Sequence, residues 1–118
     1  GIEVAAGVRL IEPLGYLEFL GLMAACRVML TDSGGIQEET TALGVPCLTV
    51  RDNTERPITV DEGTNTLLGA VAARIVPATD EILATGGKKG RIPALWDGRS
   101  AERVADLVCG GFRTLLEG

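Results

Sequence analysis

The residues best suited to bind a ligand lie in a short segment, 31–39, where Thr-Asp-Ser-Gly-Gly is followed by a pair of glutamates. The pattern is typical of a turn from a strand into a helix. At the start of a helix the backbone N–H groups have no intrahelical partner and carry the positive end of the helix dipole, so they suit a phosphate. We expect the Ser33 hydroxyl to add a hydrogen bond, and the missing Cβ atoms of Gly34 and Gly35 to let an anion approach the backbone.

Two further residues fit the same ligand. Glu39 lies about one helical turn after the glycines, and an acceptor-only carboxylate there suits the two hydroxyls of a ribose. Arg56 ends the loop Arg-Asp-Asn-Thr-Glu-Arg and offers a planar guanidinium for phosphate oxygens. Together these groups predict a site for a nucleoside diphosphate.

The same residues also have ordinary structural explanations. Ser and Gly are common in turns, and glutamates in the first turns of a helix offset its dipole. Arg56 could instead pair with Glu55 or Asp61 at the surface, where an ion pair contributes little. Phe19 lies in an apolar helix, where composition favours a core position. The nucleotide interpretation therefore depends on two loops meeting at one place.

The elements that must position these residues alternate along the chain. Apolar runs predict strands at 8–11, 28–30, 47–50 and 65–68. Helical patterns predict helices at 15–26, 35–43, 56–62 and about 79–84, with a last helix capped by Ser100. This alternation predicts an α/β fold with a parallel Rossmann-like sheet and flanking helices. Ligands bind beyond the carboxyl ends of such strands, which is where both loops are expected.

Two details concern the ends of helices and a long connection. Gly44, followed by Pro46, predicts the end of the helix at 35–43. Residues 86–99 are rich in Gly and Lys and predict a loop. Lys88 and Lys89 are expected at its solvated tip, and Trp96 is a candidate anchor for it.

Composition limits the classes of function. The 118 residues suffice for one small domain, and 46% of them are apolar. The net charge of −5 disfavours nucleic acid as a partner, and no apolar stretch reaches the roughly 20 residues of a membrane span. The chain has no histidine, so acid–base chemistry would fall to carboxylates, Lys88, Lys89 or Tyr16.

The three cysteines are odd in number and lie far apart in apolar surroundings. This spacing does not suit a metal site. We predict that Cys26, Cys47 and Cys109 are buried free thiols in a reducing, cytoplasmic compartment.

Residues 30–69 resemble the signature of the UDP-N-acetylglucosamine 2-epimerases of the non-hydrolysing type. This segment contains D-S-G-G-I-Q-E-E, A-L-G-V-P, R-D-N-T-E-R-P and E-G-T-N, in that order. The flanks are similar too: L-I-E-P-L-G-Y-L-E-F-L-G-L-M resembles the family's preceding strand and helix, and A-L-W-D-G-R-S-A-E-R-V resembles its closing segment. The resemblance covers nearly the whole chain.

The resemblance implies a fold and a set of roles. Enzymes of this family have two Rossmann-like domains of the glycosyltransferase-B type, and the C-terminal domain holds UDP in the cleft between them. By position, the backbone of Phe19 would meet the uracil, the turn 33–35 would bind the diphosphate, Glu39 the ribose, and Arg56 would lie on the diphosphate side. The implied reaction converts UDP-N-acetylglucosamine to UDP-N-acetylmannosamine by elimination and re-addition of UDP, without a metal or redox cofactor.

The chain is short for such an enzyme. The resemblance implies that residues 1–118 are an incomplete C-terminal, UDP-binding portion, and that the N-terminal domain supplies the acidic residues and histidine of the cleft. We therefore expect no catalytic residue in this chain, no activity of the chain alone, and a homo-oligomer or a complex with another chain. Three alternatives stay open: the donor-binding half of a glycosyltransferase, a portion of a hydrolysing epimerase, and a non-catalytic remnant.

Overall fold

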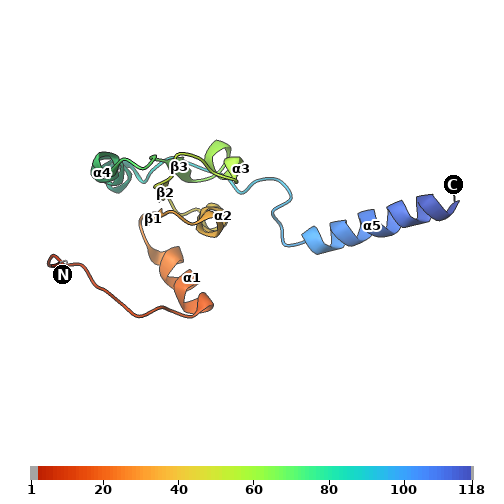
Figure 1. Cartoon of the computed structure of the whole chain (residues 1–118), viewed down its shortest axis with the longest axis horizontal. Helices are drawn as coiled ribbons and strands as arrows, with labels where there is room; N and C mark the ends of the chain where they lie inside the picture. The colour runs from red at the N-terminus through yellow and green to blue at the C-terminus, as the bar shows by residue number, and fades with distance from the viewer. Residues whose placement is uncertain (1–2, 118) are drawn as a thin grey trace.

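A computed structural model describes residues 3–117 of the chain and is organised around one small parallel sheet (Figure 1). Its strands are β1 (Met29–Thr31), β2 (Cys47–Thr49) and β3 (Asn65–Leu67), hydrogen-bonded in the order β1-β2-β3. Both pairs are parallel, with Leu30 opposite Leu48 in the first pair. The predicted α/β fold with a parallel sheet is confirmed.

Helices connect and flank these strands. They are α1 (Tyr16–Ala25), α2 (Gly34–Leu43), α3 (Pro57–Asp61), the 3₁₀ turn η1 (Ala72–Arg74), α4 (Ile75–Thr85) and α5 (Ser100–Glu117). The predicted stop of α2 is confirmed, because Gly44 is left-handed with φ 72° and Val45 donates its N–H to Thr40 O at 2.9 Å. α4 begins about four residues earlier than predicted. Pro77 does not prevent this, because a proline in the first helical turn removes an N–H that has no intrahelical acceptor.

The two faces of the sheet pack against different partners. Leu48 of β2 is buried and belongs to an apolar cluster with Ile82 of α4. The neighbouring Thr49 and Asn65 instead join Gln37 of α2 in a set of hydrogen bonds. Because successive side chains of a strand point to opposite faces, the sheet has an apolar layer toward α4 and a polar layer toward α2.

The expected strand at residues 8–11 is wrong. This segment is not assigned to a strand, and Leu10 and Ile11 are 80% and 62% exposed. The composition suits a strand, but a strand also needs a neighbour to satisfy its backbone N–H and C=O groups. Within residues 3–117 no other segment pairs with this one.

The long connection after α4 is a loop, as predicted, and Lys88 and Lys89 are exposed on it, but the Lys88 amine is not free. Its Nζ donates to the backbone carbonyl of Val60 at 2.8 Å, and partial burial lowers the pKa of the Lys88 amine. Two residues later, Gly90 packs on the backbone of Gly63, where an added Cβ would come within 2.4 Å of the Gly63 carbonyl carbon. The loop is thus fastened to the end of α3 and to the segment that joins α3 to β3.

The molecule is much longer than it is wide. Its extents are 68 × 29 × 25 Å and its Cα radius of gyration is 18.7 Å, against about 13–14 Å for a compact domain of this length. Two segments, which we call the arms, account for the difference: residues 3–15 and α5 extend away from the body, residues 16–96 (Figure 1). Among the described residues, no helix has both the length and the apolar composition needed to cross a membrane.

The three cysteines fall in different surroundings. All are free thiols, as predicted. Cys47 is buried and Cys26 is half-buried, whereas Cys109 is exposed, so the expectation of burial is wrong for Cys109. The reason is its place on α5, which projects from the body (Figure 1).

Candidate functional site

The turn that was predicted to bind an anion lies at the carboxyl end of β1. Ser33 is the residue before α2 in extended conformation, with φ −85° and ψ 132°, and its side chain makes no capping hydrogen bond. Its own N–H donates to Thr31 Oγ1 at 3.0 Å, which holds the turn closed. Gly34 and Gly35 open the helix, so their N–H groups have no acceptor inside it. The turn therefore presents a hydroxyl and backbone N–H groups at the helix end.

The next loop brings Arg56 onto this turn. An added Cβ on Gly34 would lie 2.8 Å from Arg56 Nη1, so the guanidinium rests against the glycine. At Gly35 an added Cβ would meet nothing within 4 Å, which leaves open space beside the helix end. The predicted meeting of the two loops is confirmed. Gly34 also has a role that was not predicted, because a side chain there would occupy the place of the arginine.

Carboxylates surround Arg56. Its Nε lies 2.9 Å from Glu38 Oε1, and its Nη1 lies 3.7 Å from Glu55 Oε2. Nε has no partner with hydrogen-bond geometry, so the contact with Glu38 is an ion pair without an aligned hydrogen bond. Of the two surface partners considered for Arg56, Glu55 is present. Arg51 holds Glu55 more closely, at 2.6 and 3.1 Å, and these hydrogen bonds lower the pKa of Glu55.

Glu39 lies where α2 meets α1, the helix that contains Phe19. Tyr16 Oη donates to Glu39 Oε1 at 3.1 Å, and this hydrogen bond to a carboxylate raises the pKa of Tyr16. Glu39 is half-buried, so part of its carboxylate stays available to a ligand. Phe19 is half-buried and its backbone N–H donates to Gly15 O at 2.9 Å, inside the helix.

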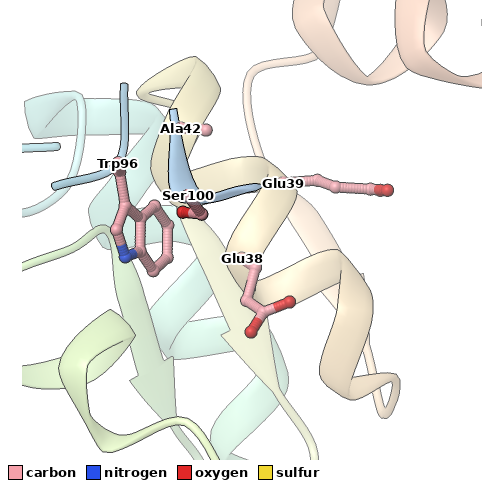
Figure 2. Close-up of a pocket in the computed structure, with 5 residues that line it drawn as sticks. All are labelled: Glu38, Glu39, Ala42, Trp96 and Ser100. Atoms are coloured by element: carbon pink, nitrogen blue, oxygen red, sulfur yellow. The ribbon is translucent and has the colours of Figure 1, made fainter. Parts of the chain in front are cut away.

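A hollow of about 390 Å³ lies on the outer side of α2 (Figure 2). It is lined by Glu38, Glu39, Ala42, Trp96 and Ser100. Figure 2 shows the indole on one side of α2 and the Glu39 side chain extending away from it. Trp96 is half-buried and lines this hollow with residues of α2, and its role as an anchor of the loop stays a prediction. The sequence did not indicate that this loop and the start of α5 reach the same helix as the glutamates.

Buried polar residues below the turn were also missed. Gln37 and Asn65 are both 0% exposed and bond to each other, with Asn65 Nδ2 donating to Gln37 Oε1 at 3.0 Å. Thr54 Oγ1, in the arginine loop, donates to the same oxygen at 2.6 Å. The available signal was an amide side chain at a position facing the core, where an apolar residue is the norm.

The arrangement as a whole suits an anion joined to a diol. It offers backbone N–H groups and a guanidinium on one side and a carboxylate acceptor on the other. Within residues 3–117 no group of three or more His, Cys, Asp or Glu side chains could hold a metal ion.

Comparison with known proteins gives a consistent result. Residues 2–109 match the family of UDP-N-acetylglucosamine 2-epimerase. The UDP-N-acetylglucosamine 2-epimerase of Methanocaldococcus jannaschii is 44% identical over 104 residues, covering 88% of this chain and 28% of that protein. The enzyme of Campylobacter jejuni is 34% identical over 110 residues, covering 90% and 29%.

Solved structures agree. The Methanocaldococcus jannaschii enzyme in complex with UDP-GlcNAc and UDP matches with a TM-score of 0.70 at 44% identity, over 84% of this chain and 27% of that one. The Neisseria meningitidis enzyme bound to UDP-GlcNAc matches with a TM-score of 0.59, also at 44% identity, over 64% of this chain and 20% of that one. The chain thus spans less than a third of the length of these relatives. The resemblance seen in the motifs of residues 30–69 is confirmed, and the chain belongs to the UDP-N-acetylglucosamine 2-epimerase family.

Proposed function

We propose that this chain is the UDP-binding portion of a UDP-N-acetylglucosamine 2-epimerase. The observation that carries the proposal is the Arg56 guanidinium against Gly34, because it joins a cation and a helix N-terminus from two loops at one edge of the sheet. The relative from Methanocaldococcus jannaschii, crystallised with UDP-GlcNAc and UDP, supports the choice of ligand. The chain would belong to the C-terminal domain of a two-domain, glycosyltransferase-B-type enzyme.

In this proposal each site residue contacts one part of UDP. The turn 33–35 and Arg56 hold the diphosphate, and Arg56 exchanges its contact with Glu38 for phosphate oxygens. Glu39 accepts hydrogen bonds from the ribose hydroxyls, and Phe19 lies beside the uracil. The exchange at Arg56 is feasible because its carboxylate partners are 46% and 59% exposed, so water can solvate them when the arginine turns to the ligand.

The reaction of the parent enzyme explains why UDP must be held tightly. Loss of the proton at C2 and breakage of the bond from C1 to UDP leave a glycal, and re-addition of UDP with protonation at C2 gives UDP-N-acetylmannosamine. The diphosphate is first the leaving group and then the nucleophile, so N–H groups and a guanidinium stabilise its charge in both steps. We assign no catalytic residue to this chain, since it has no histidine and every site residue named above is assigned to holding UDP.

The proposal extends to partners and location. The rest of the parent enzyme would cover the open side of the site and supply the acid–base groups. The chain alone would associate with itself, because its arms expose apolar side chains. Three free thiols favour the cytoplasm. No metal or redox cofactor takes part in this proposal.

Titration of the purified chain with UDP, followed by NMR or calorimetry, tests the proposal. Glu39→Ala should weaken UDP by roughly 1–3 kcal/mol through lost charge-assisted hydrogen bonds. The loss should be much smaller for 2′,3′-dideoxyuridine diphosphate, which lacks both hydroxyls. Glu81→Ala, on α4, is the matched control and should change neither affinity. Equal losses of affinity for the two nucleotides would show that Glu39 does not bind the ribose hydroxyls. Absence of UDP binding would refute the proposal.

The parent enzyme distinguishes the remaining alternatives. An epimerase converts UDP-N-acetylglucosamine without an acceptor, whereas a glycosyltransferase transfers its sugar to one. A hydrolysing enzyme would release free N-acetylmannosamine and UDP, and a non-hydrolysing one would keep the product linked to the nucleotide. Proton NMR of the sugar anomeric signals separates these outcomes.

A further inference from the structure

One buried side chain connects the two loops of the proposed site. Gln37 of α2 is 0% exposed and lies one helical turn after Ser33. Its Nε2 donates to Ser33 O at 3.3 Å, and its Oε1 accepts from Thr54 Oγ1 at 2.6 Å and from Asn65 Nδ2 at 3.0 Å. A single amide thus bonds to the anion-binding turn, to the arginine loop and to strand β3.

The contact with Thr54 leads directly to Arg56. The Thr54 hydroxyl donates to Gln37 and accepts from the backbone N–H of Arg56 at 3.0 Å. On the other side of Arg56, its carbonyl accepts from Thr59 Oγ1 at 2.7 Å, and Thr59 Oγ1 accepts from Asn65 Nδ2 at 3.1 Å. The backbone of Arg56 is therefore bonded on both sides to a network that contains Gln37.

These buried polar side chains destabilise the fold unless each of them has a hydrogen-bond partner. Thr59 and Asn65 are fully buried with Gln37, and an unpaired polar group at such a position is strongly unfavourable. Thr49 Oγ1 completes the set by donating to Asn65 Oδ1 at 2.5 Å. Apolar residues would fill the same space without the cost of an unpaired polar group. They would not fix the orientation of the loop, because apolar contacts are not directional.

We propose that Gln37 is a positioning residue that holds the Arg56 loop against the Ser33 turn, so that the guanidinium and the helix N-terminus face the same diphosphate. The inference rests on the proposed function only in its last step, since the placement of Arg56 can be measured without a ligand. Gln37 itself does not touch the nucleotide.

Thr40 provides the matched control. It is also 0% exposed and lies on the same helix, but its hydroxyl bonds to carbonyls of α2, at 2.8 and 3.2 Å, and to the Cys47 thiol of β2, not to the arginine loop. Thr40→Val removes a buried hydroxyl without cutting a link to the arginine loop. A residue that merely stabilises α2 would behave like Thr40.

The experiment compares Gln37→Met, Thr54→Val, the double variant and Thr40→Val in the full chain. The first readout is the NMR resonance of the Arg56 Nε–H group without ligand, and the second is the affinity for UDP. We expect Gln37→Met and Thr54→Val each to move this resonance toward that of a free arginine and to weaken UDP about tenfold, because small misplacements of a binding group are costly. The double variant should lose no more UDP affinity than the weaker-binding single variant, because the two substitutions break the same connection.

The outcomes separate the two proposals. Thr40→Val should lower the unfolding temperature but leave the Arg56 resonance and the UDP affinity within twofold of the original chain. An unchanged resonance in Gln37→Met, or an equal shift in Thr40→Val, would overturn the positioning role. If Gln37→Met does not fold, Thr54→Val alone decides in the same way. If the original chain does not bind UDP but the Arg56 resonance still shifts in both Gln37→Met and Thr54→Val, the proposed function is refuted and the positioning role stands.

Discussion

The body and the arms of this molecule depart from the usual distribution of residues in opposite ways: the body buries polar side chains and the arms expose apolar ones. In the body, amides and hydroxyls such as those of Asn65 and Thr49 are fully buried and paired. In the arms, large apolar side chains face water: Leu10 is 80% exposed and Leu107 is 76% exposed. Charge and hydropathy would place these residues the other way round.

This contrast shows what an apolar pattern can and cannot predict. The apolar residues of α5 recur at helical spacing, and α5 is indeed a helix. The pattern predicts that this apolar stripe of α5 can be buried, but it does not identify the surface that would cover it. In the body, packing of α2 and α3 on the sheet creates buried space, and Gln37 and Asn65 fill part of it because they bond to each other.

The largest expected difference between the body and an arm is in thiol reactivity. Cys47 is buried in β2, and burial raises the pKa of its thiol, so alkylation requires opening of the body. Cys109 is exposed on α5, so the reagent reaches it without any opening of the body. We expect iodoacetamide to label Cys109 at least about a thousandfold faster, given a body stability of about 5 kcal/mol. Peptide mass spectrometry over time measures both rates of labelling. Comparable rates in the native chain would show that Cys47 is as accessible as Cys109.

The second prediction concerns stability. Asn65→Leu keeps the size of the side chain but removes one buried hydrogen bond each from Thr49, Thr59 and Gln37. We expect a loss of about 3 kcal/mol in the free energy of unfolding. Leu107→Ala, on the exposed stripe of α5, should cost less than about 0.5 kcal/mol. Urea denaturation followed by circular dichroism measures both, and similar losses would mean that α5 packs on the body in solution.

The third prediction concerns association through the arms. The exposed stripe of α5, which includes Val104, Leu107 and Val108, should draw chains together at micromolar concentration. Leu107→Glu should raise the dissociation constant at least about tenfold, because a charge would have to be buried at the contact. Ala105→Glu, which adds the same charge beside the stripe, is the control. Sedimentation velocity over a concentration series measures the constants, and a monomer at all concentrations would contradict the prediction.

The smallest expected effect is the pH dependence of the base of α5. Asp97 accepts hydrogen bonds from Arg103, and these lower its pKa from the ordinary 3.8 to about 2. A lowered pKa means that the contact stabilises the folded form above about pH 4, and that this contribution disappears as the pH falls toward 2. Carboxyl-carbon NMR should show Asp97 titrating near pH 2, and Asp97→Asn should abolish the accompanying change in helix signal. Titration near pH 4 would show that the pair does not form.

Much of the fold follows from local patterns. The strand and helix positions in the body depend on apolar periodicity, on Gly44 as a helix stop and on Pro57 as a helix start, which are properties of neighbouring residues. The turn 33–35 and Arg56 were predicted as parts of one site, because parallel strands place their following loops at one edge. The exposed strand-like segment 8–11 was mispredicted because pairing depends on a neighbour that local pattern cannot supply.

The motifs and the alternation of elements were enough to identify the fold class and the family, and they supplied the residues that we propose bind a nucleoside diphosphate. Four features depend on how the chain packs: Arg56 lies against Gly34, Gln37 links the turn to the arginine loop, Lys88 fastens a loop and Cys109 is exposed. These features depend on residues that are far apart along the sequence. Turn geometry and periodicity act over a few residues, whereas Gln37 and Asn65 are 28 positions apart and meet only after the sheet and α2 have packed.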